Sequence, residues 1–380
     1  MRVASLFSGI GGFELGLHDI GAVPVLQCEI DPLAKEILQS RFPDVDFHDD
    51  VTSLESLPKC DMLVAGWPCQ DLSQAGRMAG LKGANSGLIE HVFRLIDATV
   101  PKPSRVILEN VAFSLSLDKG RAIQEVTAAL EERGYRWAYR IFDTNFFGLP
   151  QRRRRIYIYA SLVDDPVVIL FDGSNESAFP AAANDASPTD IGFYWTEGNR
   201  GVGWTVNAVP PLKGGSALSI PSPPAIWHQG KNLFSMPGIA DAERLQGFPK
   251  GWTKLEAAHD RQRWKLVGNA VSVPVVKWIA SRIQHGGATW DGDETRKGTR
   301  TSNAAFGGPT ASKRCLFGMH EGPTGTHAAT LEKFQMNGGR PLSARAASGF
   351  LSRYKKSKLR KNEKFLNELS KYCNKLNNES

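Results

Sequence analysis

Short apolar runs alternate with amphipathic stretches along the first third of the chain. Strands alternating with helices of this length are typical of βαβ units in a mainly parallel sheet. We therefore predict an α/β fold with helices on both faces of the sheet. The expected strands are Arg2–Phe7, Val23–Gln27, Asp61–Ala65 and Arg105–Leu108, and the expected helices are Phe13–Ile20, Pro32–Arg41 and Gly87–Thr99.

The pattern changes after Ala160, where proline, glycine, serine and asparagine become frequent and no long helical pattern remains. The tryptophan, phenylalanine and isoleucine content of this stretch favours a small, loop-rich folded domain over a disordered linker. Further on, helical patterns recur at Asp241–Phe248 and Val275–Gln284, and again at Ser343–Lys356 and Asn362–Leu376. The expected segments are 1–160, 161–240, 241–285, a Gly/Thr/Ser-rich linker at 286–340, and a basic helical tail at 341–380.

Two chemically useful side chains follow strands of the predicted sheet. Cys69 lies in Gly66-Trp-Pro-Cys-Gln70, directly after one strand, and Glu109 follows the next strand. Ligands bind at the carboxyl edge of open α/β sheets, so neighbouring strand ends bring Cys69 and Glu109 to one rim. A lone cysteine at a strand end is more often a buried apolar residue. The polar loop that follows, however, is too hydrophilic for a core.

A glycine-rich turn after the first strand predicts a cofactor site. Gly9, Gly11 and Gly12 precede a helix, and Glu29 lies 20 residues after Gly9, where an acidic residue can bind ribose hydroxyls. The spacing is not that of a dinucleotide fingerprint, which makes an NAD enzyme the weaker interpretation. A nucleoside cofactor without a diphosphate, such as S-adenosylmethionine, fits better. Asp50, at a third strand exit, is a candidate partner for an adenine amino group.

Charge and cysteine usage narrow the class of protein. Residues 286–380 carry 17 Lys and Arg against 8 Asp and Glu, whereas the whole chain has a net charge of +7. A basic region of this kind indicates either a polyanionic partner or a solvated lysine-rich tail. Five scattered cysteines without paired spacing predict neither a disulfide framework nor a metal site. The sequence begins with a strand rather than a signal peptide and has no apolar run of membrane-spanning length, so we expect a cytoplasmic protein.

Six motifs together resemble the DNA (cytosine-5)-methyltransferase family. They occur in the family's order and cover residues 1–285, leaving the tail outside. The motifs are Phe7-Ser-Gly-Ile-Gly-Gly12, Gly66-Trp-Pro-Cys-Gln70, Glu109-Asn-Val111, Gln151 with Arg153 and Arg155, Arg244-Leu-Gln-Gly-Phe-Pro249, and Gly268-Asn-Ala-Val-Ser-Val-Pro274. The resemblance implies a Rossmann-like S-adenosylmethionine methyltransferase sheet with a small target-recognition domain. It also implies cofactor contacts from Phe7, Gly9, Gly11, Gly12, Glu29, Ile30, Asp50, Val51, Pro68, Asn269 and Val271.

The resemblance also implies a covalent mechanism. A Cys69 thiolate attacks C6 of cytosine, which makes C5 nucleophilic. Glu109 donates to N3, Arg155 holds O2, and Asn110 orients the loop. Arg153 and Arg155, which can share one face of a strand, are candidates for the positive charge that favours the thiolate. The target base must be flipped out of double-stranded DNA. Expected DNA contacts are Gln70, Ser73, Arg77 and Arg244, with Lys82 a further candidate for a flanking phosphate.

Three other functions stay open at this point. An RNA (tRNA) cytosine-5 methyltransferase would share the motifs, although about 80 residues in the middle region leave room for base readout in DNA. A non-catalytic DNA-binding relative is disfavoured by the presence of Cys69, Glu109 and Arg155 together. An NAD oxidoreductase is the least favoured. We expect a monomer without metal or membrane partners, and the motifs leave open whether a cognate restriction endonuclease exists.

Overall fold

The computed structural model describes residues 1–68, 87–171, 189–199, 201–214, 223–256, 258–286, 303–309, 315–336 and 338–378. Its chain forms two compact units, and each unit draws on segments far apart in the sequence. Unit 1 comprises 1–143, 154–179 and 271–326, and unit 2 comprises 144–153, 180–270 and 327–380. None of the helices in the described ranges is both long enough and apolar enough to span a bilayer.

Unit 1 is built on a large mixed sheet in the order β13-β12-β6-β7-β5-β4-β1-β2-β3. Strands β1 to β5 are parallel to one another, and β7 runs antiparallel to both β5 and β6. The strands are β1 Arg2–Leu6, β2 Val23–Cys28, β3 Asp46–His48, β4 Met62–Gly66, β5 Arg105–Val111, β6 Arg136–Asp143, β7 Arg154–Ser161, β12 Ala304–Gly307 and β13 Cys315–Phe317. The predicted α/β class with a parallel sheet core is confirmed.

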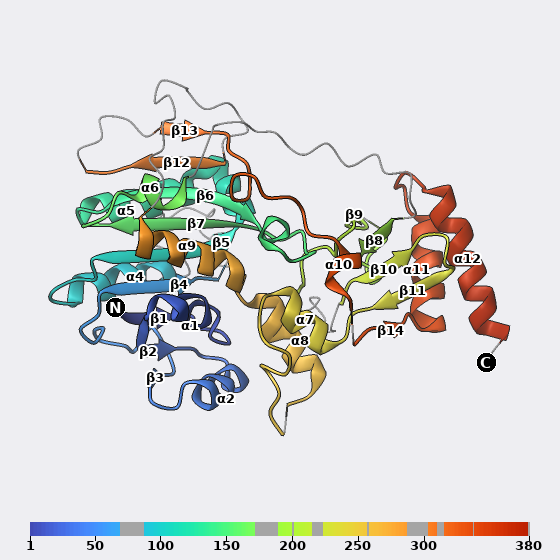
Figure 1. Ribbon diagram of the computed structural model, residues 1–380, viewed down its shortest axis with the longest axis horizontal. Helices are drawn as coiled ribbons and strands as arrows, with labels where there is room; N and C mark the ends of the chain where they lie inside the picture. The colour runs from blue at the N-terminus through green and yellow to red at the C-terminus, as the bar shows by residue number, and fades with distance from the viewer. Residues whose placement is uncertain are drawn as a thin grey trace. The chain divides into compact units, whose positions relative to one another are not determined.

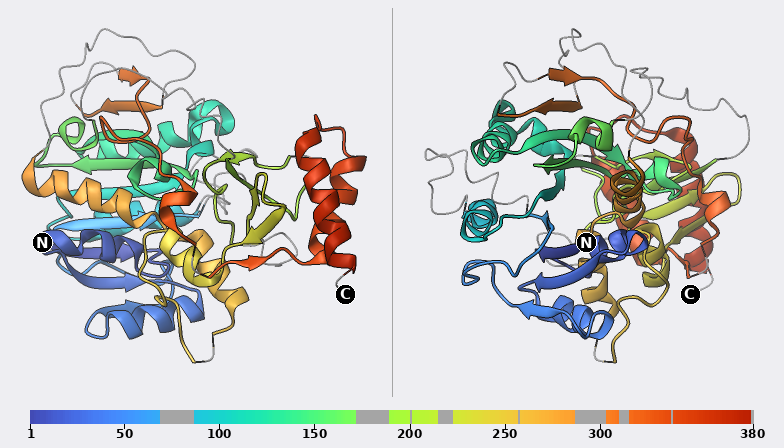
Figure 2. Two further views of the ribbon diagram at one scale, coloured as in Figure 1. Left: turned by 45° about the vertical axis from the view of Figure 1, so that its right-hand side comes forward. Right: turned by 60° about the vertical axis from the view of Figure 1, so that its left-hand side comes forward.

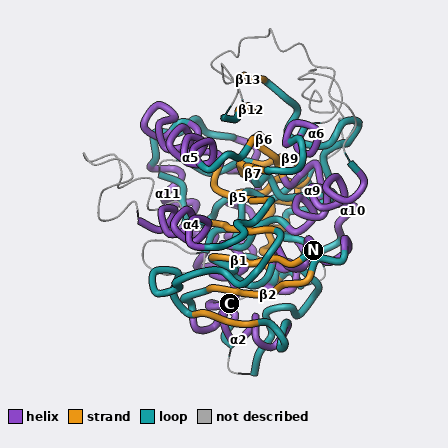
Figure 3. Tube along the Cα trace, turned by 90° about the vertical axis from the view of Figure 1, so that its left-hand side faces the viewer, coloured by secondary structure: helices purple, strands orange, loops and turns teal. Residues whose placement is uncertain are grey.

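Helices cover both faces of this sheet, as expected from the sequence. In Figure 3, α4 and α5 lie on one side of the strands and α6 and α9 on the other. The helices of unit 1 are α1 Gly12–Leu17, α2 Pro32–Arg41, α4 Gly87–Ala98, α5 Arg121–Glu132, α6 Pro166–Leu170 and α9 Val273–His285. Close packing of α1 on α9 depends on Gly16, because a Cβ there would lie 2.5 Å from Val276 Cβ. The late helix thus returns to the first part of the chain.

The described parts of segment 286–340 differ from the expected linker. Strand β12 pairs with β6, and β13 extends the sheet beyond it. The buried guanidinium of Arg140, on β6, explains this attachment: it donates to the carbonyl oxygens of His320, at 2.7 Å, and Gly322, at 2.6 Å. The apolar pieces of β12 and β13 are too short to give a periodic signal in sequence.

Unit 2 contains a second sheet in the order β14-β11-β10-β8-β9. Helices α11 and α12 lie side by side against it (Figure 1), and their pairing is also visible in Figure 2. The elements are β8 Asp190–Phe193, β9 Thr205–Val206, β10 Ala225–His228, β11 Leu233–Met236, β14 Arg340–Pro341, α7 Ile239–Leu245, α8 Asp260–Asn269, α10 Leu331–Phe334, α11 Ala344–Lys356 and α12 Glu363–Asn378.

The basic tail therefore forms part of the core of unit 2. Phe365, on α12, is fully buried and meets Phe193, on β8, edge to face with ring centroids 5.2 Å apart. Trp227 also contacts Phe365, and its indole N–H donates to Glu368 at 2.8 Å. The lysines of α11 and α12 lie on the exposed face of these helices, whereas the aromatic side chains pack inward. The segment is therefore basic in composition and still forms part of a core. The domain boundary expected at 340/341 thus falls inside unit 2.

Candidate active site

The carboxyl ends of the parallel strands form the rim on which the candidate site is built. Gly66, the last residue of β4, lies opposite Glu109 of β5 in the parallel register. Strand β1 lies at the centre of this region, with β4 and β5 on one side of it and β2 and β3 on the other. Such a reversal of strand order creates the crevice where α/β proteins bind ligands. The strand ends that carry the predicted chemistry thus meet at one edge of the sheet.

Glu109 and Arg155 form an ion pair at this rim. The Nε atom of Arg155 lies 3.0 Å from Oε1 of Glu109, and the two side chains are 16% and 9% exposed. The Nη1 group of Arg155 donates to the Arg154 carbonyl at 2.9 Å. Its Nη2 group has no hydrogen-bond partner among the described residues. One face of the guanidinium is therefore held by the protein, and Nη2 can bind a ligand.

Asn110 fixes the start of the loop that carries the predicted nucleophile. Its Nδ2 donates to the Trp67 carbonyl at 3.2 Å, and its Oδ1 accepts from the Val111 N–H at 2.7 Å. Asn110 and Trp67 are both buried. A buried amide bonded on both sides ties β5 to the residue just before Pro68. This contact supports the orienting role expected for Asn110.

The glycine turn after β1 is stabilised by Glu29. One carboxylate oxygen of Glu29 accepts the Gly9 N–H at 2.8 Å, and the other accepts the Asp31 N–H at 2.9 Å. Gly9 and Gly11 both have positive φ, at 57° and 84°, which favours glycine. A Cβ on Gly9 would meet nothing within 4 Å, so the turn borders open space. The predicted cofactor residues are thus joined in one turn.

Two further rim positions come from β2 and β3. Asp50 accepts the Thr52 N–H at 2.9 Å, and this backbone bond lowers the pKa of its carboxyl. Ile30 is one of the exposed large apolar side chains, whereas the neighbouring Val51 is buried. An ionised carboxylate beside an apolar surface suits a nucleoside, which presents amino groups and a flat ring. By contrast, burial and the charges of Glu29, Asp50 and Asp49 raise the pKa of the Cys28 thiol to about 12, so Cys28 is an inert thiol.

Val271 joins the site from the late part of the chain. A Cβ built on Gly66 would lie 3.6 Å from Val271 Cγ1 and 3.5 Å from Glu109 Oε2. Gly66 therefore lies between the candidate acid and the last motif. Asn269, the other late residue expected at the cofactor, belongs to unit 2 and has an exposed side chain. A Cβ on Gly214 would lie only 2.4 Å from its Oδ1, so the Gly214 turn approaches Asn269 closely.

Arg153 was expected on the same strand face as Arg155, near the nucleophile, and its contacts in the structure are of a different kind. It precedes β7, is 1% exposed, and donates to the carbonyls of Leu212, Gly268 and Ala270 at 3.2, 3.1 and 2.7 Å. A guanidinium enclosed by backbone carbonyls binds the last motif to the rest of unit 2. These contacts suit a positioning residue rather than a clamp on the substrate.

Gln151 and Gln246 complete this buried network, and Gln246 was not singled out from the sequence. Gln151 donates to the Leu245 carbonyl at 2.8 Å and accepts the Leu212 N–H at 2.9 Å. Gln246 donates to the Val267 carbonyl at 2.8 Å. The network keeps 241–270 in unit 2, whereas 241–285 was expected to return as one piece. The motif Arg244-Leu-Gln-Gly-Phe-Pro249, which contains Gln246, was the available signal in the sequence.

Arg244, an expected DNA contact, also makes contacts within the protein. Its guanidinium donates to the carbonyls of Phe334 and Gln335 at 3.0 and 3.1 Å and stacks over the Phe334 ring at 4.3 Å.

A second buried network, which the sequence analysis did not predict, is centred on Glu243. Its carboxylate is 3.0 Å from Arg263 and accepts the Thr253 N–H at 2.8 Å. Both networks join segments distant in sequence.

Several predicted site residues lie outside the described residues. They are the candidate nucleophile Cys69 and the candidate DNA contacts Gln70, Ser73, Arg77 and Lys82. Pro68, the last residue described before them, is exposed. Within the described ranges, no group of three histidine, cysteine, aspartate or glutamate side chains is arranged to hold a metal ion.

Comparisons with known proteins identify a matching family model and similar chains. The family model for C-5 cytosine-specific DNA methylases matches residues 1–191 and 239–285. The type II methyltransferase M2.BsuMI of Bacillus subtilis (strain 168) is 42% identical over 98% of both chains. The type II methyltransferase M1.ScrFI of Lactococcus lactis subsp. cremoris is 31% identical over 74% of this chain and 77% of its own.

A solved structure shares the fold. The S. pombe Dnmt2 methyltransferase matches with a TM-score of 0.56 at 19% identity, covering 74% of this chain and 97% of that one. The rim described above therefore lies on a scaffold of known architecture.

Proposed function

Since the chain belongs to the C-5 cytosine-specific DNA methylase family and is a DNA (cytosine-5)-methyltransferase, we propose that Cys69 is its nucleophile and S-adenosylmethionine its methyl donor. The substrate is a flipped-out cytosine in a specific double-stranded DNA sequence. The ion pair between Glu109 and Arg155 carries this proposal, because it sets an acid and a cation beside the end of β4, and Cys69 follows that end by three residues in the sequence. The type II relatives favour a role in restriction–modification.

The residues at the rim match the charge that develops on the base. When a thiolate adds to C6, negative charge builds towards N3 and O2 of the ring. Glu109, in its protonated form, donates a proton to N3, and the Nη2 group of Arg155 binds O2. Donors aimed at developing charge in a partly buried site contribute strongly to the rate. The same two side chains hold each other before the base enters, so the site is preorganised.

Cys69 acts reversibly in this scheme. Its Sγ–C6 bond forms as N3 gains a proton, which converts C5 into an enamine-like carbon. After C5 has gained the methyl group, a solvent base takes the C5 proton, the Sγ–C6 bond breaks to release the thiolate, and N3 returns its proton to Glu109, which restores the aromatic ring. A free thiol with a pKa of about 8.5 is only slightly ionised at neutral pH, so nearby positive charge favours the thiolate. Arg155 supplies such a charge at the rim.

The strand ends of unit 1 suit S-adenosylmethionine. When bound, this cofactor supplies an electrophilic methyl group on a sulfonium sulfur, so no metal is needed for the transfer. Glu29 keeps unused lone pairs for ribose hydroxyls, and the ionised Asp50 can accept from an amino group. Open space beside Gly9 leaves room for the ligand. Phe7, Gly11, Gly12, Ile30, Val51, Pro68, Asn269 and Val271 are proposed as the remaining contacts.

Access to the base requires the DNA to deform. C5 and C6 of a paired cytosine are shielded in the duplex, so the nucleotide must leave the stack at a cost of a few kcal/mol. Gln70, Ser73 and Arg77 follow Cys69 directly and are proposed to hold the DNA around the extruded nucleotide. Unit 2, with its separate sheet, is proposed to read the surrounding sequence.

Trapping with a fluorinated base tests the proposal. Duplex DNA containing 5-fluorocytosine is incubated with the protein and labelled S-adenosylmethionine, with the recognition sequence first determined by bisulfite sequencing of DNA from expressing cells. A fluorine at C5 cannot leave as a proton, so the covalent adduct should accumulate. We expect a labelled protein–DNA adduct that is absent from Cys69→Ser. An adduct formed only with RNA would favour the RNA methyltransferase alternative, and binding without any adduct would favour a non-catalytic relative.

A further inference from the structure

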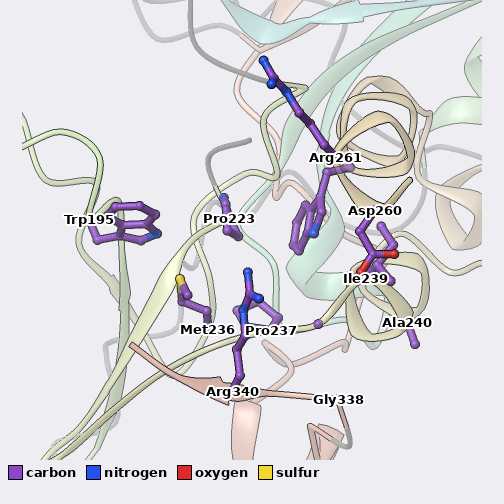
Figure 4. Close-up of a pocket in the computed structure, with 12 residues that line it drawn as sticks. Trp195, Pro223, Met236, Pro237, Ile239, Ala240, Asp260, Arg261, Gly338 and Arg340 are labelled. Atoms are coloured by element: carbon purple, nitrogen blue, oxygen red, sulfur yellow. The ribbon is translucent and has the colours of Figure 1, made fainter. Parts of the chain in front are cut away.

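A pocket of about 590 Å³ opens within unit 2, between the small sheet and helices α7 and α8. Its walls combine aromatic, apolar and cationic side chains, among them Trp195, Trp264, Met236 and Arg340. Figure 4 shows the Arg340 side chain rising from β14 between Met236 and Pro237 into the pocket, whereas Arg261 points away from its centre. Arg340 is exposed, and its guanidinium has no partner among the described residues.

The backbone of Arg340 is held firmly although its side chain is free. Strand β14 pairs with β11, with Arg340 opposite Met236. The buried carboxylate of Asp241 accepts the N–H of Gly338 at 2.8 Å. Gly238 and Gly338 pass so close that a Cβ on Gly238 would lie 2.3 Å from the Gly338 carbonyl oxygen. Arg340 is therefore presented from a fixed edge strand.

Arg244 contributes to the same presentation. It binds the carbonyls of Phe334 and Gln335, a few residues before Arg340. The opposite wall is fixed in a similar way, because Arg353 of α11 donates to the Trp195 carbonyl at 2.8 Å. The C-terminal segment thus supplies one wall of the pocket and anchors another.

We propose that this pocket contacts the DNA duplex beside the target cytosine and that Arg340 is a specificity-determining residue that reads a guanine. This inference rests on the DNA substrate of the proposed function. An arginine fork binds guanine O6 and N7 with two parallel hydrogen bonds, which is the commonest specific contact in the major groove. The pocket holds one such fork that no described side chain occupies.

The walls favour a base edge over a phosphate. A phosphate needs only charge and donors, whereas Met236, Pro237 and Trp195 offer apolar surface that suits a thymine methyl or a base edge. Among the described wall residues the one acid, Asp260, is paired with Arg263 at 3.0 Å. The uncompensated charge of the pocket is therefore positive, as DNA requires.

The place of Arg340 in the sequence agrees with a role in specificity. Parts shared by a family carry its common chemistry, whereas the choice of DNA sequence differs between members. The family model matches 1–191 and 239–285, so β10, β11 and β14 lie outside it. The small sheet and the C-terminal segment are where a difference in recognition can reside.

Methylation profiling of two Arg340 variants tests this inference. Plasmids that carry a randomised site are propagated in cells expressing the full chain, Arg340→Ala or Arg340→Lys, and methylated sites are read by bisulfite sequencing. We expect both variants to lose preference for guanine at one position, with the rate ratio between guanine and the other bases falling roughly 10- to 100-fold. Lysine keeps the charge but not the fork, so it should fail like alanine.

Arg345→Ala is the matched control, because Arg345 is also exposed and in unit 2 but does not line the pocket. Its sequence preference should equal that of the unchanged protein. Unchanged preference in both Arg340 variants would overturn the inference. A loss that is equal for all sites, and rescued by lysine, would also overturn it, since that behaviour indicates a phosphate contact. Absence of methylation by the unchanged protein would instead contradict the proposed function.

Discussion

Nε of Arg155 and Oε1 of Glu109 are 3.0 Å apart because of the register between β5 and β7. Val111 lies opposite Arg155, and Glu109 lies opposite Tyr157, so Glu109 and Arg155 are diagonal neighbours on one face. Diagonal neighbours are within reach of long side chains. The pair thus depends on sheet geometry, and a substitution at Arg155 changes the site while β5 and β7 keep their pairing.

Replacement of Arg155 by alanine should remove most of the activity. The variant loses the Nη2 donor proposed to bind O2, where negative charge develops. We expect a fall of about 10²–10³-fold in the single-turnover methylation rate, which is typical for loss of one such donor. The measurement is rapid-quench transfer of label from S-adenosylmethionine to duplex DNA.

Arg154→Ala provides the neighbouring control. The Arg154 guanidinium pairs with the buried Glu321, with Nε 2.7 Å from Oε2, in a contact that joins β7 to the 315–326 segment. Its removal leaves a buried carboxylate without its partner, so we expect a loss of about 1–3 kcal/mol in unfolding free energy. The single-turnover rate of the folded fraction should stay within about twofold. The reverse pattern, with activity lost in Arg154→Ala and kept in Arg155→Ala, would contradict the assignment.

Asn110→Asp should uncouple the nucleophile loop from β5. The change replaces the donor to the Trp67 carbonyl with a second acceptor, so the two oxygens repel. We expect a lower yield of the 5-fluorocytosine adduct together with a loss of about 1–3 kcal/mol in stability. Asn303→Asp is the matched control. The Asn303 side chain donates to the Met319 carbonyl and accepts the Met319 N–H, both at 2.8 Å, and this contact is not at the rim. It should cost similar stability and leave the adduct yield of the folded protein unchanged.

The elements of the first third could be predicted from the sequence because their signals are local. The helix Pro32–Arg41 has the bounds expected of it, since Asp31 accepts the Leu33 N–H at 3.1 Å and Pro32 opens the first turn. The rim position of Glu109 follows from its place after a predicted strand, and Arg155 is indicated by the motif that resembles the family's. Such features depend on neighbours along the chain.

The roles of Arg153 and Arg244 could not be predicted in the same way. Both lie in motifs, but their partners are backbone carbonyls of segments up to 117 residues away. A sequence shows that an arginine is present without showing which carbonyl it meets. The same reason explains why strand β12 was not predicted and its segment was expected to be a linker. Its partner, β6, lies far away in the sequence.

The C-terminal helices should prove indispensable for folding of unit 2. Phe365 is fully buried against six other aromatic rings, including Phe193 and Trp204. Phe365→Ala should lower the unfolding free energy by about 3–5 kcal/mol, because it leaves a cavity. Phe113→Ala, at a position 64% exposed, should change it by less than about 0.5 kcal/mol. Urea unfolding followed by tryptophan fluorescence measures both, and equal effects would contradict a core role for α12.

A buried carboxyl in α1 predicts a specific dependence of stability on pH. Glu14 is buried, and burial raises the pKa of its carboxyl above the ordinary 4.5. Between 4.5 and that higher value the folded state holds a proton that the unfolded state has released. The free energy of unfolding therefore falls as pH rises through this window. Gln27 donates to Glu14 Oε1 at 3.0 Å, a bond that a glutamine side chain can also accept.

Glu14→Gln should remove this slope. The variant carries no ionisable group at the site, so its stability relative to the unchanged protein should grow as pH rises above about 4.5 and level off once the folded pKa is passed. Chemical denaturation between pH 4.5 and 8 measures the difference. Glu36→Gln, on the exposed side of α2, makes the same change of charge and should shift stability by a small amount without that rise. If the two variants instead follow parallel curves, Glu14 does not bind its proton more tightly in the folded state.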